Sequence, residues 1–535
     1  MSACDHRLQN VEGWSVQNLD LLRILNENAA ISRLDFTDDK LGALLDKISD
    51  VGVWGAVESA INGRSLSIYR LNETDSLATF RLDAAPMQSH GQVKTDGLLQ
   101  YGYHKHHADL PQFKVKLCSL DNDLTHFSYP VASMTVSGNQ SDDGLYIPII
   151  EQSKAVLRNT QGYERGNLYI GDSKFGAIDN RAYVVAQEDY YLMPLSLVQL
   201  PQKARKAIIE NTDKSLYSDV TRVEGKETVA IATGFETTET INYTLNGQVF
   251  TWSERRLFVQ SAAYATSQIA AFDARLSKVK ATLTDLCVRK KGKAVIETAE
   301  LLQKEIDKLL KDSHLGDFLT VEIATTTTTT ILRAYGTKPA RTVQSHVFEL
   351  LMTTNDAAID SHKALLGWQV YATNTPVLLL PFADCVFKYR HQSNIEHNLD
   401  HLRNKVAHLV PVFLQKESRI IGLVHILSLA LKVCAVLEYK IADALHKTNA
   451  QLSNIYEGNP KRSTPRPSAK RICKAFKGIA AAIICTDGGI QYAVMTPLDD
   501  KQTYILQLLG IPQTVYTKIV QNAKFFLGVV KKSAG

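Results

Sequence analysis

The chain has 535 residues, of which 45% are hydrophobic and 21% are charged. This composition is typical of folded domains and excludes a wholly disordered chain, and the length suggests roughly three or four domains. The formal net charge of +5 permits binding to nucleic acid but does not by itself indicate it.

The cysteine pattern argues against a disulfide or zinc framework. Seven cysteines are present at wide spacings and none forms a CxxC pair. An odd number at such spacings fits a reducing, cytosolic compartment. Residues 1–14 contain neither a basic segment nor an apolar run, so we expect no signal peptide.

One segment is apolar enough to require a membrane test. Residues 420–437 are nearly all apolar over a length that could span a bilayer. His425 and Lys432 lie inside the segment, and Glu438 and Lys440 follow it directly. Because a charge near the bilayer centre is costly, we predict a buried core helix and no membrane association.

The first 199 residues predict helices followed by a mixed sheet. Residues 1–75 read as mostly helical, since apolar residues recur at three- and four-residue spacing within 38–61. From Leu77 onward the hydrophobic period changes to two. The expected strands are 78–85, 112–121, 125–136, 167–171 and 190–196, and the expected helices are 147–159 and 174–187. This order predicts an α/β fold, with helices covering a mixed sheet.

Residues 200–366 differ from the preceding residues in composition and in expected secondary structure. Residues 221–261 are rich in β-branched residues and contain an Asn246-Gly247 pair, which is typical of a hairpin turn. A long basic helix is expected at about 262–312, and the β-prone segment 318–336 includes six consecutive threonines. We interpret this block as a β-rich insertion with one long helix, whose basic face is either solvated or a track for phosphates.

The remaining residues are expected to form core elements first and then a linker and a C-terminal unit outside the core. The predicted elements are a strand at 367–374, a long helix at 381–406, the apolar helix at 419–448, a basic, proline-containing linker at 457–468 and a small helical unit at 469–535.

Three carboxylates occupy positions suited to a metal-dependent site. Asp83 and Asp172 each end a predicted strand, and Glu396 lies on a predicted helix. Open α/β sheets place their sites at the carboxyl ends of adjacent strands, and three carboxylates that meet there need a cation. Oxygen ligands select Mg²⁺ or Mn²⁺, and two such ions suit displacement at a phosphodiester. Taken alone, capping or turn roles are the more common explanation.

Eight segments together carry a more specific pattern. They are 102–117 (GYHKHHADLPQFKVKL), 137–148 (SGNQSDDGLYIP), 168–196, 250–261 (FTWSERRLFVQS), 367–376 (GWQVYATNTP), 389–405 (YRHQSNIEHNLDHLRNK), 413–439 and 458–479. In this order they resemble the DDE transposases of bacterial insertion sequences, specifically the insertion-sequence-four superfamily and its branch with a long β-rich insertion. The resemblance covers about Thr37 to Leu509.

The resemblance implies an RNase H-like catalytic core interrupted by the insertion. The implied domains are a helical DNA-binding region at 1–75, either whole or shortened, the core at 76–199 and 367–456, the insertion at 200–366, and a linker with a helical unit at 457–535. Asp83, Asp172 and Glu396 become the catalytic residues, which hold two Mg²⁺ or Mn²⁺ ions. The 224 residues between Asp172 and Glu396 fit the family only if they contain an insertion.

The resemblance also implies the partners. They are double-stranded DNA, both the terminal inverted repeats of a mobile element and its target, and a second copy of the chain in the DNA complex. The implied reaction is cut-and-paste transposition, a form of DNA recombination, in the bacterial cytoplasm at the nucleoid.

Residues for DNA binding follow from the family signature and from the insertion. On the glutamate helix, Tyr389 matches the signature, Gln392 replaces its arginine and Arg403 replaces its lysine. If that helix is continuous, these residues and Glu396 lie near one face. The other expected DNA contacts are Trp368, which is favoured to stack on a flipped base, its rival Trp252, and Arg255, Arg256, Lys290 and Lys291.

Two departures from the family keep alternatives open. Ala84 and Ala85 follow the first aspartate, where the family usually has a hydroxyl residue. Residues 1–33 match the family's N-terminal unit poorly. A catalytically inactive, DNA-binding relic and an RNase H-like nuclease therefore remain alternatives to an active transposase.

Overall fold

A computed structural model describes residues 6–69, 77–102, 109–122, 124–125, 128–160, 162–224, 227–288, 296, 298–334, 339, 341–405, 407–486 and 489–530. The chain forms two compact units, each considered by itself below. The first comprises Met1–Ser196, Thr238–Arg255 and Ala372–Gly535, and the second comprises Leu197–Thr237 and Arg256–Tyr371. The second unit overlaps the predicted insertion 200–366, except that Thr238–Arg255 belongs to the first unit.

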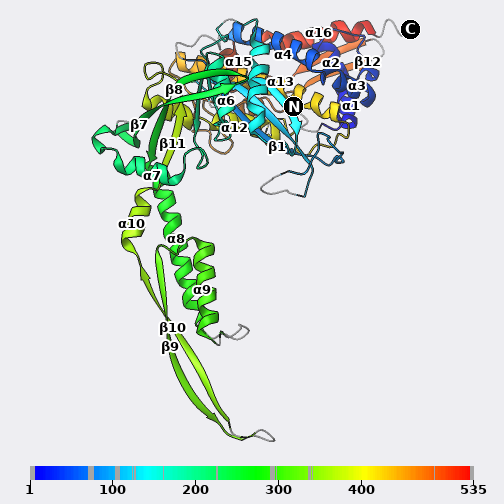
Figure 1. Cartoon of the computed structure of the whole chain (residues 1–535). Coiled ribbons are helices and arrows are strands. Elements are labelled where there is room, and N and C mark those ends of the chain that lie inside the picture. Colours follow the sequence, from blue (N-terminus) through cyan, green and yellow to red (C-terminus); the bar gives the residue numbers. More distant parts are fainter. Residues whose placement is uncertain are drawn as a thin grey trace. The chain divides into compact units, whose positions relative to one another are not determined.

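A nine-stranded mixed sheet is the main β-structure (Figure 1), and its strand order is β3-β2-β1-β4-β5-β11-β8-β7-β6. The strands are β1 (Thr79–Gln88), β2 (Gln112–Leu120), β3 (Tyr129–Ser137), β4 (Leu168–Ile170), β5 (Tyr190–Pro194), β6 (Ser218–Glu224), β7 (Glu227–Leu245), β8 (Gln248–Ser261) and β11 (Trp368–Thr373). β1, β2 and β3 pair antiparallel, whereas β4 is parallel to both β1 and β5. The α/β class predicted from the sequence is confirmed.

Helices of the first unit cover this sheet and build the N-terminal region. They are α1 (Leu8–Gln17), α2 (Leu19–Leu25), α3 (Asp38–Ile48), α4 (Val51–Tyr69), α5 (Tyr146–Leu157), α6 (Ile178–Ala186), α11 (Phe382–Arg390), α12 (Ser393–Asp400) and α13 (Glu417–Lys447), with short 3-10 turns at Arg33–Phe36 and Asp143–Leu145. α5 packs on β2 and β3, α12 packs on β1 and β2, and α13 packs on β3 and α3.

The apolar helix α13 is a core helix. It is the one helix among the described residues that is long and apolar enough to cross a membrane, and 67% of its apolar window is buried. The ammonium group of Lys432 donates to the carbonyls of Pro130 and Val131 and lies 3.2 Å from the Glu58 carboxylate. These contacts compensate a buried charge within the protein, so α13 is a core helix of the first unit.

The C-terminal part contains a hairpin that the sequence analysis missed. It consists of α14 (Ala469–Ala475), β12 (Ala481–Thr486), β13 (Gly489–Met495), α15 (Asp500–Leu509) and α16 (Thr514–Val530), and β12 pairs antiparallel with β13. The expectation of a purely helical unit at 469–535 is therefore wrong. An Asp-Gly pair between two apolar runs is the hairpin signal in this segment.

The second unit contains two helices where one was predicted at 262–312. Its remaining elements are α7 (Gln202–Asn211), a 3-10 turn at Lys214–Leu216, α8 (Ala262–Leu286), α9 (Ala299–Ser313), β9 (Leu319–Leu332), β10 (Arg341–Thr354) and α10 (Asp356–Ala364). Thr298 caps α9, because its side-chain oxygen accepts from the backbone N–H of Leu301 at 3.3 Å. α7, β10 and α10 were not predicted from the sequence.

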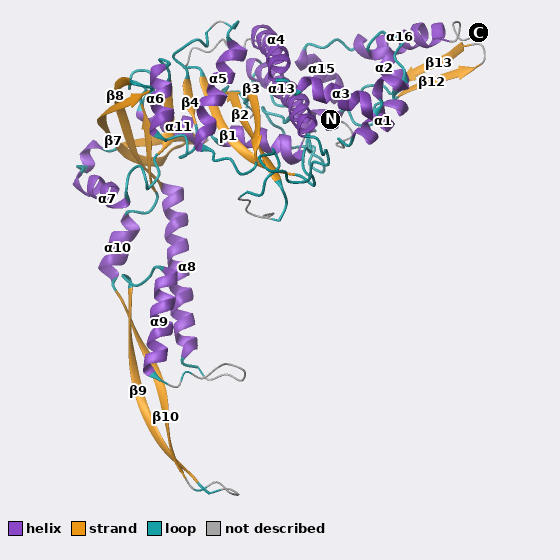
Figure 2. Ribbon diagram, turned by 45° about the vertical axis from the view of Figure 1, so that its right-hand side comes forward, coloured by secondary structure: helices purple, strands orange, loops and turns teal. Residues whose placement is uncertain are grey.

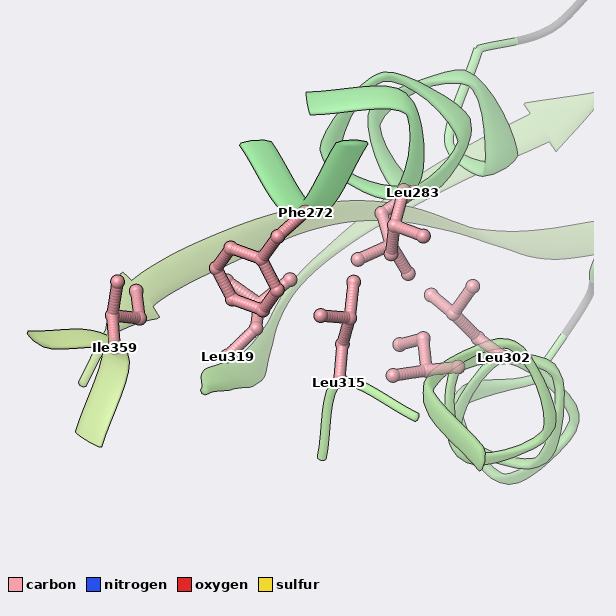
Figure 3. Close-up of a cluster of buried hydrophobic side chains, with 8 residues drawn as sticks. Phe272, Leu283, Leu302, Leu315, Leu319 and Ile359 are labelled. Atoms are coloured by element: carbon pink, nitrogen blue, oxygen red, sulfur yellow. The ribbon is translucent and has the colours of Figure 1, made fainter. Parts of the chain in front are cut away.

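Burial explains why the long helix is divided. Phe272 and Leu283 of α8 pack against Leu302 of α9, together with Leu315, Leu319 and other apolar side chains (Figure 3). A single continuous helix would leave its apolar stripe in water, whereas two paired helices bury their stripes against each other.

Candidate active site

The structure brings Asp83 and Asp172 together at matched positions of two neighbouring parallel strands. The last residue pair of β1 and β4 is Arg81 with Ile170. Asp83 lies two residues beyond Arg81, and Asp172 lies two residues beyond Ile170. Asp172 follows the end of β4 as predicted, but Asp83 does not end its strand, because β1 continues to Gln88. The charge of Asp172 raises the pKa of Asp83, so the two carboxylates also interact electrostatically.

The surroundings of Asp83 perturb the pKa of its carboxyl group. Burial raises its pKa from 3.8 to about 6, and the charges of Asp172 and Glu396 act in the same direction. The positive charge of Lys116 and a 2.8 Å hydrogen bond from the Ala84 N–H oppose this rise. Asp83 therefore lies close to other negatively charged carboxylates, and this is the electrostatic condition for binding a cation.

Asp172 is held in a fixed orientation by two donors. The Tyr146 hydroxyl donates to its Oδ1 at 2.5 Å, and the Lys174 N–H donates to the same oxygen at 2.9 Å. Tyr146 begins α5 and is buried, and its pKa is raised by burial and by the charge of Asp172. The phenol therefore remains a proton donor that aims this carboxylate.

Lys116 is a component of the site that the sequence analysis did not identify. It lies on β2 and is fully buried, with its Nζ 3.3 Å from the centre of the Tyr146 ring. Burial lowers the pKa of Lys116 to about 8, against the opposing effect of Asp83 and Asp172. No hydrogen-bond partner for this Nζ is found among the described residues, so its charge acts through space on the two carboxylates and on the Tyr146 ring.

Glu396 projects from α12, which is anchored to the sheet by buried amides. Asn394 donates to the Asp121 carboxylate at 3.0 Å. Asn398 donates to Ser119 Oγ at 3.0 Å and to the Ser128 carbonyl at 2.7 Å. Glu396 lies between these two asparagines in the sequence and is exposed, so the anchored face of the helix determines where its carboxylate stands.

The helix expected at 381–406 is divided in the structure, so the prediction of one continuous helix is wrong. α11 ends at Arg390, α12 begins at Ser393, and a π-helical turn follows at His401–Lys405. The break lies at the Lys388 carbonyl, to which Arg81 donates at 2.9 Å. In a continuous helix that carbonyl would accept from the Gln392 N–H, which instead reaches Tyr389 at 3.0 Å.

The signature residues near the break contact the protein itself. The Gln392 Oε1 accepts from Arg81 at 3.4 Å. Arg403 donates to the Pro86 carbonyl of β1 at 3.0 Å, and the charge of Asp83 acts on its guanidinium, whose pKa burial lowers. Tyr389 is half-buried in the last turn of α11. Arg403 therefore lies beside the first aspartate even though the helix is not continuous.

Two residues expected to contact DNA are core residues. Trp252 is 8% exposed, and its indole N–H donates to the Tyr191 hydroxyl at 2.8 Å. Arg255 is 5% exposed and donates to the carbonyls of Thr375 and Leu380 at 2.9 and 2.8 Å. The prediction of DNA contacts by these residues is corrected, since both side chains serve the interior of the first unit.

The other expected DNA contacts lie in the second unit or beyond the described residues. Trp368 is half-buried and meets the rings of Tyr217 and Phe235 edge to face, with centroids 5.9 Å apart in both pairs. Arg256 is half-exposed on β8. Lys290 and Lys291 fall outside the described residues.

The carboxylates of Asp83, Asp172 and Glu396 are the groups that could bind a divalent cation. Across the described ranges, no three His, Cys, Asp or Glu side chains are grouped closely enough to hold a metal ion. Two oxygen ligands, Asp83 and Asp172, do lie at matched strand positions, and Glu396 is near enough to raise the pKa of Asp83. This arrangement fits a hard cation, because the charge of the cation would relieve the repulsion that Asp83 experiences from its neighbours.

Known proteins offer no direct guide to this site: no model of a known protein family matches the chain, and no curated protein sequence matches it.

Proposed function

We propose that this chain is a DDE transposase that moves an insertion sequence by cutting DNA at the element's ends and joining it elsewhere. The observation that carries the proposal is the placement of Asp83 and Asp172 two residues beyond the last pair of two parallel strands, with Glu396 close enough to act on Asp83. This is the carboxylate arrangement expected of the resembled family.

The topology of the first unit supports the proposal. Three antiparallel strands are followed by two parallel ones, in the order β3-β2-β1-β4-β5. This order agrees with an RNase H-like core, in which the first aspartate lies on the central strand and the second follows the neighbouring strand. α12 then supplies the glutamate from a helix packed on β1.

Asp83, Asp172 and Glu396 would hold Mg²⁺ or Mn²⁺. When bound, two such ions supply a stronger nucleophile and neutralise the charge that develops on the leaving oxygen. The protein contributes the orientation of the carboxylates: Tyr146 aims Asp172, and Asn394 and Asn398 hold the helix that carries Glu396.

The reaction expected at this site is phosphodiester hydrolysis followed by strand transfer. Water adds to the phosphorus at the element end, the bond to the bridging 3′ oxygen breaks, and a 3′-hydroxyl is released. That hydroxyl then attacks a second phosphodiester. Arg403 is suited to hold the phosphate, because its guanidinium lies beside Asp83 and keeps its charge at all ordinary pH values. Tyr389 is its proposed companion.

The partners and location follow from the same proposal. They are double-stranded terminal repeats and target DNA, and a second copy of the chain within the DNA complex, in the bacterial cytoplasm. A DNA-binding relic without activity is the second candidate, because Ala84 and Ala85 stand where the family has a hydroxyl. Neither alanine can donate a hydrogen bond through its side chain to a phosphate.

Nicking of an end-containing plasmid tests the proposal. The inverted repeats that flank the reading frame are cloned into a supercoiled plasmid, which is incubated with the purified protein, with and without Mg²⁺. We expect Mg²⁺-dependent nicks at the repeat ends, and loss of nicking in Asp172→Asn. Specific binding to the repeats without nicking would identify the relic. An Asp172→Asn protein that is folded and still nicks would contradict the assignment.

A further inference from the structure

The second unit contains a two-stranded ribbon, β9–β10, whose outer half lies apart from the unit's core. The strands pair antiparallel from Leu319 with Thr354 to Leu332 with Arg341, and no other strand in the described part of the chain pairs with either. Figures 1 and 2 show the ribbon continuing well past the ends of α8 and α9.

The base of the ribbon is anchored and its outer half is not. Val321, Ile323, Phe348 and Leu350 pack against the buried cluster that α8 and α9 form. Beyond them, every residue of Thr325–Thr330 is exposed, although successive side chains point to opposite faces of a strand. Both faces and both edges of the outer half therefore meet solvent.

The outer half of the ribbon contributes little stability to the fold. A two-stranded hairpin is marginal in water without a layer packed on it. Exposed strand edges also invite pairing with other chains. An exposed projection of this length is therefore expected to gain a partner, and its charges indicate which kind.

The charge of the outer half is entirely positive. Residues 323–348 contain three cations and no acidic residue, whereas Glu322 and Glu349 flank them. Of the cations, Arg333 follows the end of β9 and is exposed, and Arg341 begins β10. The strands themselves are lined by uncharged hydrogen-bonding side chains, chiefly the six threonines with Gln344, Ser345 and His346. This composition is complementary to a polyanion.

The dimensions fit a DNA groove. The eight residues from Thr325 to Leu332 extend for about 27 Å at the usual rise of a strand. A two-stranded ribbon can enter the major groove, and proteins that bind the minor groove use arginine together with an apolar wedge such as proline. Pro339, which is exposed, precedes Arg341 at the start of β10 by two residues, so a residue of this apolar type lies close in the sequence to an arginine.

We propose that the outer half of the β9–β10 ribbon is an arm that binds double-stranded DNA, with Arg333 and Arg341 on phosphates or in a groove and the threonine hydroxyls along the backbone. The arm is distinct from the carboxylate site and recognises DNA by charge and shape. The inference rests on the proposed function only in the class of partner, and it can be tested without any cleavage.

The experiment compares the full-length protein with a trimmed variant. Residues 327–346 are replaced by Asn-Gly, which closes the hairpin after the Thr326–Val347 pair with a favoured two-residue turn and leaves Phe348 and Leu350 in place. Binding to a fluorescent duplex of about 40 base pairs and arbitrary sequence is measured by anisotropy in EDTA over a range of salt concentrations. We expect the variant to bind about tenfold more weakly or worse, with unchanged circular dichroism.

A charge-reversal variant separates charge from bulk. Arg333→Glu/Arg341→Glu should weaken binding and reduce the slope of log affinity against log salt by about 0.9 for each phosphate that the arm no longer neutralises. Lys203→Glu/Lys214→Glu, at exposed positions elsewhere in the same unit, makes the same change in net charge and should leave the slope nearly unaltered.

Unchanged DNA affinity in the trimmed variant would contradict the proposed DNA-binding arm. If that variant also no longer self-associates in sedimentation, the ribbon is instead a contact between copies of the chain. Because the duplex carries no element end and no divalent cation is present, either result leaves the nicking test of the proposed function independent.

Discussion

The guanidinium of Arg81 donates a hydrogen bond to the Lys388 carbonyl at 2.9 Å, across 307 residues of sequence. Arg81 lies on β1 two residues before Asp83, and Lys388 lies on α11 eight residues before Glu396. The same guanidinium donates twice to the Asp121 carboxylate, at 2.9 and 2.7 Å. One buried side chain thus links the strand of the first carboxylate to the helix segment that leads to the third.

The first prediction follows from this link. Arg81→Met should lower the free energy of unfolding by about 3–5 kcal/mol, because it leaves the Asp121 carboxylate buried without its cation. Urea denaturation followed by circular dichroism measures the loss. The nicking rate should fall by more than the loss of folded protein explains, because Glu396 is no longer positioned relative to β1.

A conservative variant separates charge from geometry. Arg81→Lys keeps the charge near Asp121 but cannot also reach Lys388, because an ammonium lacks the guanidinium fork. It should recover most of the stability and little of the nicking. Full recovery of nicking would show that the bond to Lys388 does not position Glu396.

The second prediction concerns Asp83 and pH. Its pKa is raised from 3.8 to about 6, so between pH 4 and 6 the folded state binds more protons than the unfolded state, and stability falls as pH rises through this window. Asp83→Asn lacks this penalty. In EDTA, the variant should therefore be more stable than the native chain by about 3 kcal/mol well above pH 6, and this difference should become small towards pH 4.

Lys116 provides the control for this titration. Its charge lowers the pKa of Asp83, so Lys116→Met should move the upper end of the window above pH 6. Denaturation curves at half-unit pH intervals resolve the shift. A window that stays in place would mean that Lys116 does not act on Asp83.

The third prediction distinguishes the two tryptophans. Trp252→Ala should cost about 3–5 kcal/mol of stability, as expected when a large core aromatic is removed. Trp368→Ala should cost less, about 1–2 kcal/mol, because half-burial removes less apolar surface from water. If Trp368 stacks on a flipped base, its variant should make the first nick at a nearly normal rate and form or open the terminal hairpin slowly. Resolving both steps on a denaturing gel is the measurement, and an equal slowing of the two would make Trp368 structural.

The fourth prediction concerns Arg403. If it holds the phosphate at the element end, Arg403→Ala should reduce the slope of log affinity against log salt by about one for end-containing DNA. Anisotropy titrations at several salt concentrations give the slope. Arg403→Lys is the control, because it keeps the charge and should keep the slope; an unaltered slope in the alanine variant would place Arg403 away from DNA.

Much of the sheet and the positions of two carboxylates could be predicted from local sequence. The alternation at 78–85 and 112–121 anticipated β1 and β2, and the short apolar run before Asp172 anticipated β4. The pattern works because a half-buried strand repeats every two residues. Asp172 was recognisable as a polar residue just beyond a strand, whereas Asp83 lies in the middle of β1, which runs on to Gln88. The structure places both two residues beyond the last pair of β1 and β4.

Other features were settled only by tertiary contacts. The segment between α11 and α12 contains no proline or glycine that would predict a break. The break arises because the Lys388 carbonyl accepts a hydrogen bond from Arg81, which lies on β1. In the sequence, Lys116 is indistinguishable from any other lysine in an alternating strand. Only the packing of α5 on β2 places its ammonium against the Tyr146 ring and close to the carboxylates of Asp83 and Asp172. Trp368 was favoured over Trp252 for stacking on a base, and burial distinguishes the two, because Trp252 is buried and Trp368 is half-buried. In each case the deciding partner is remote along the chain, and a local period carries no information about it.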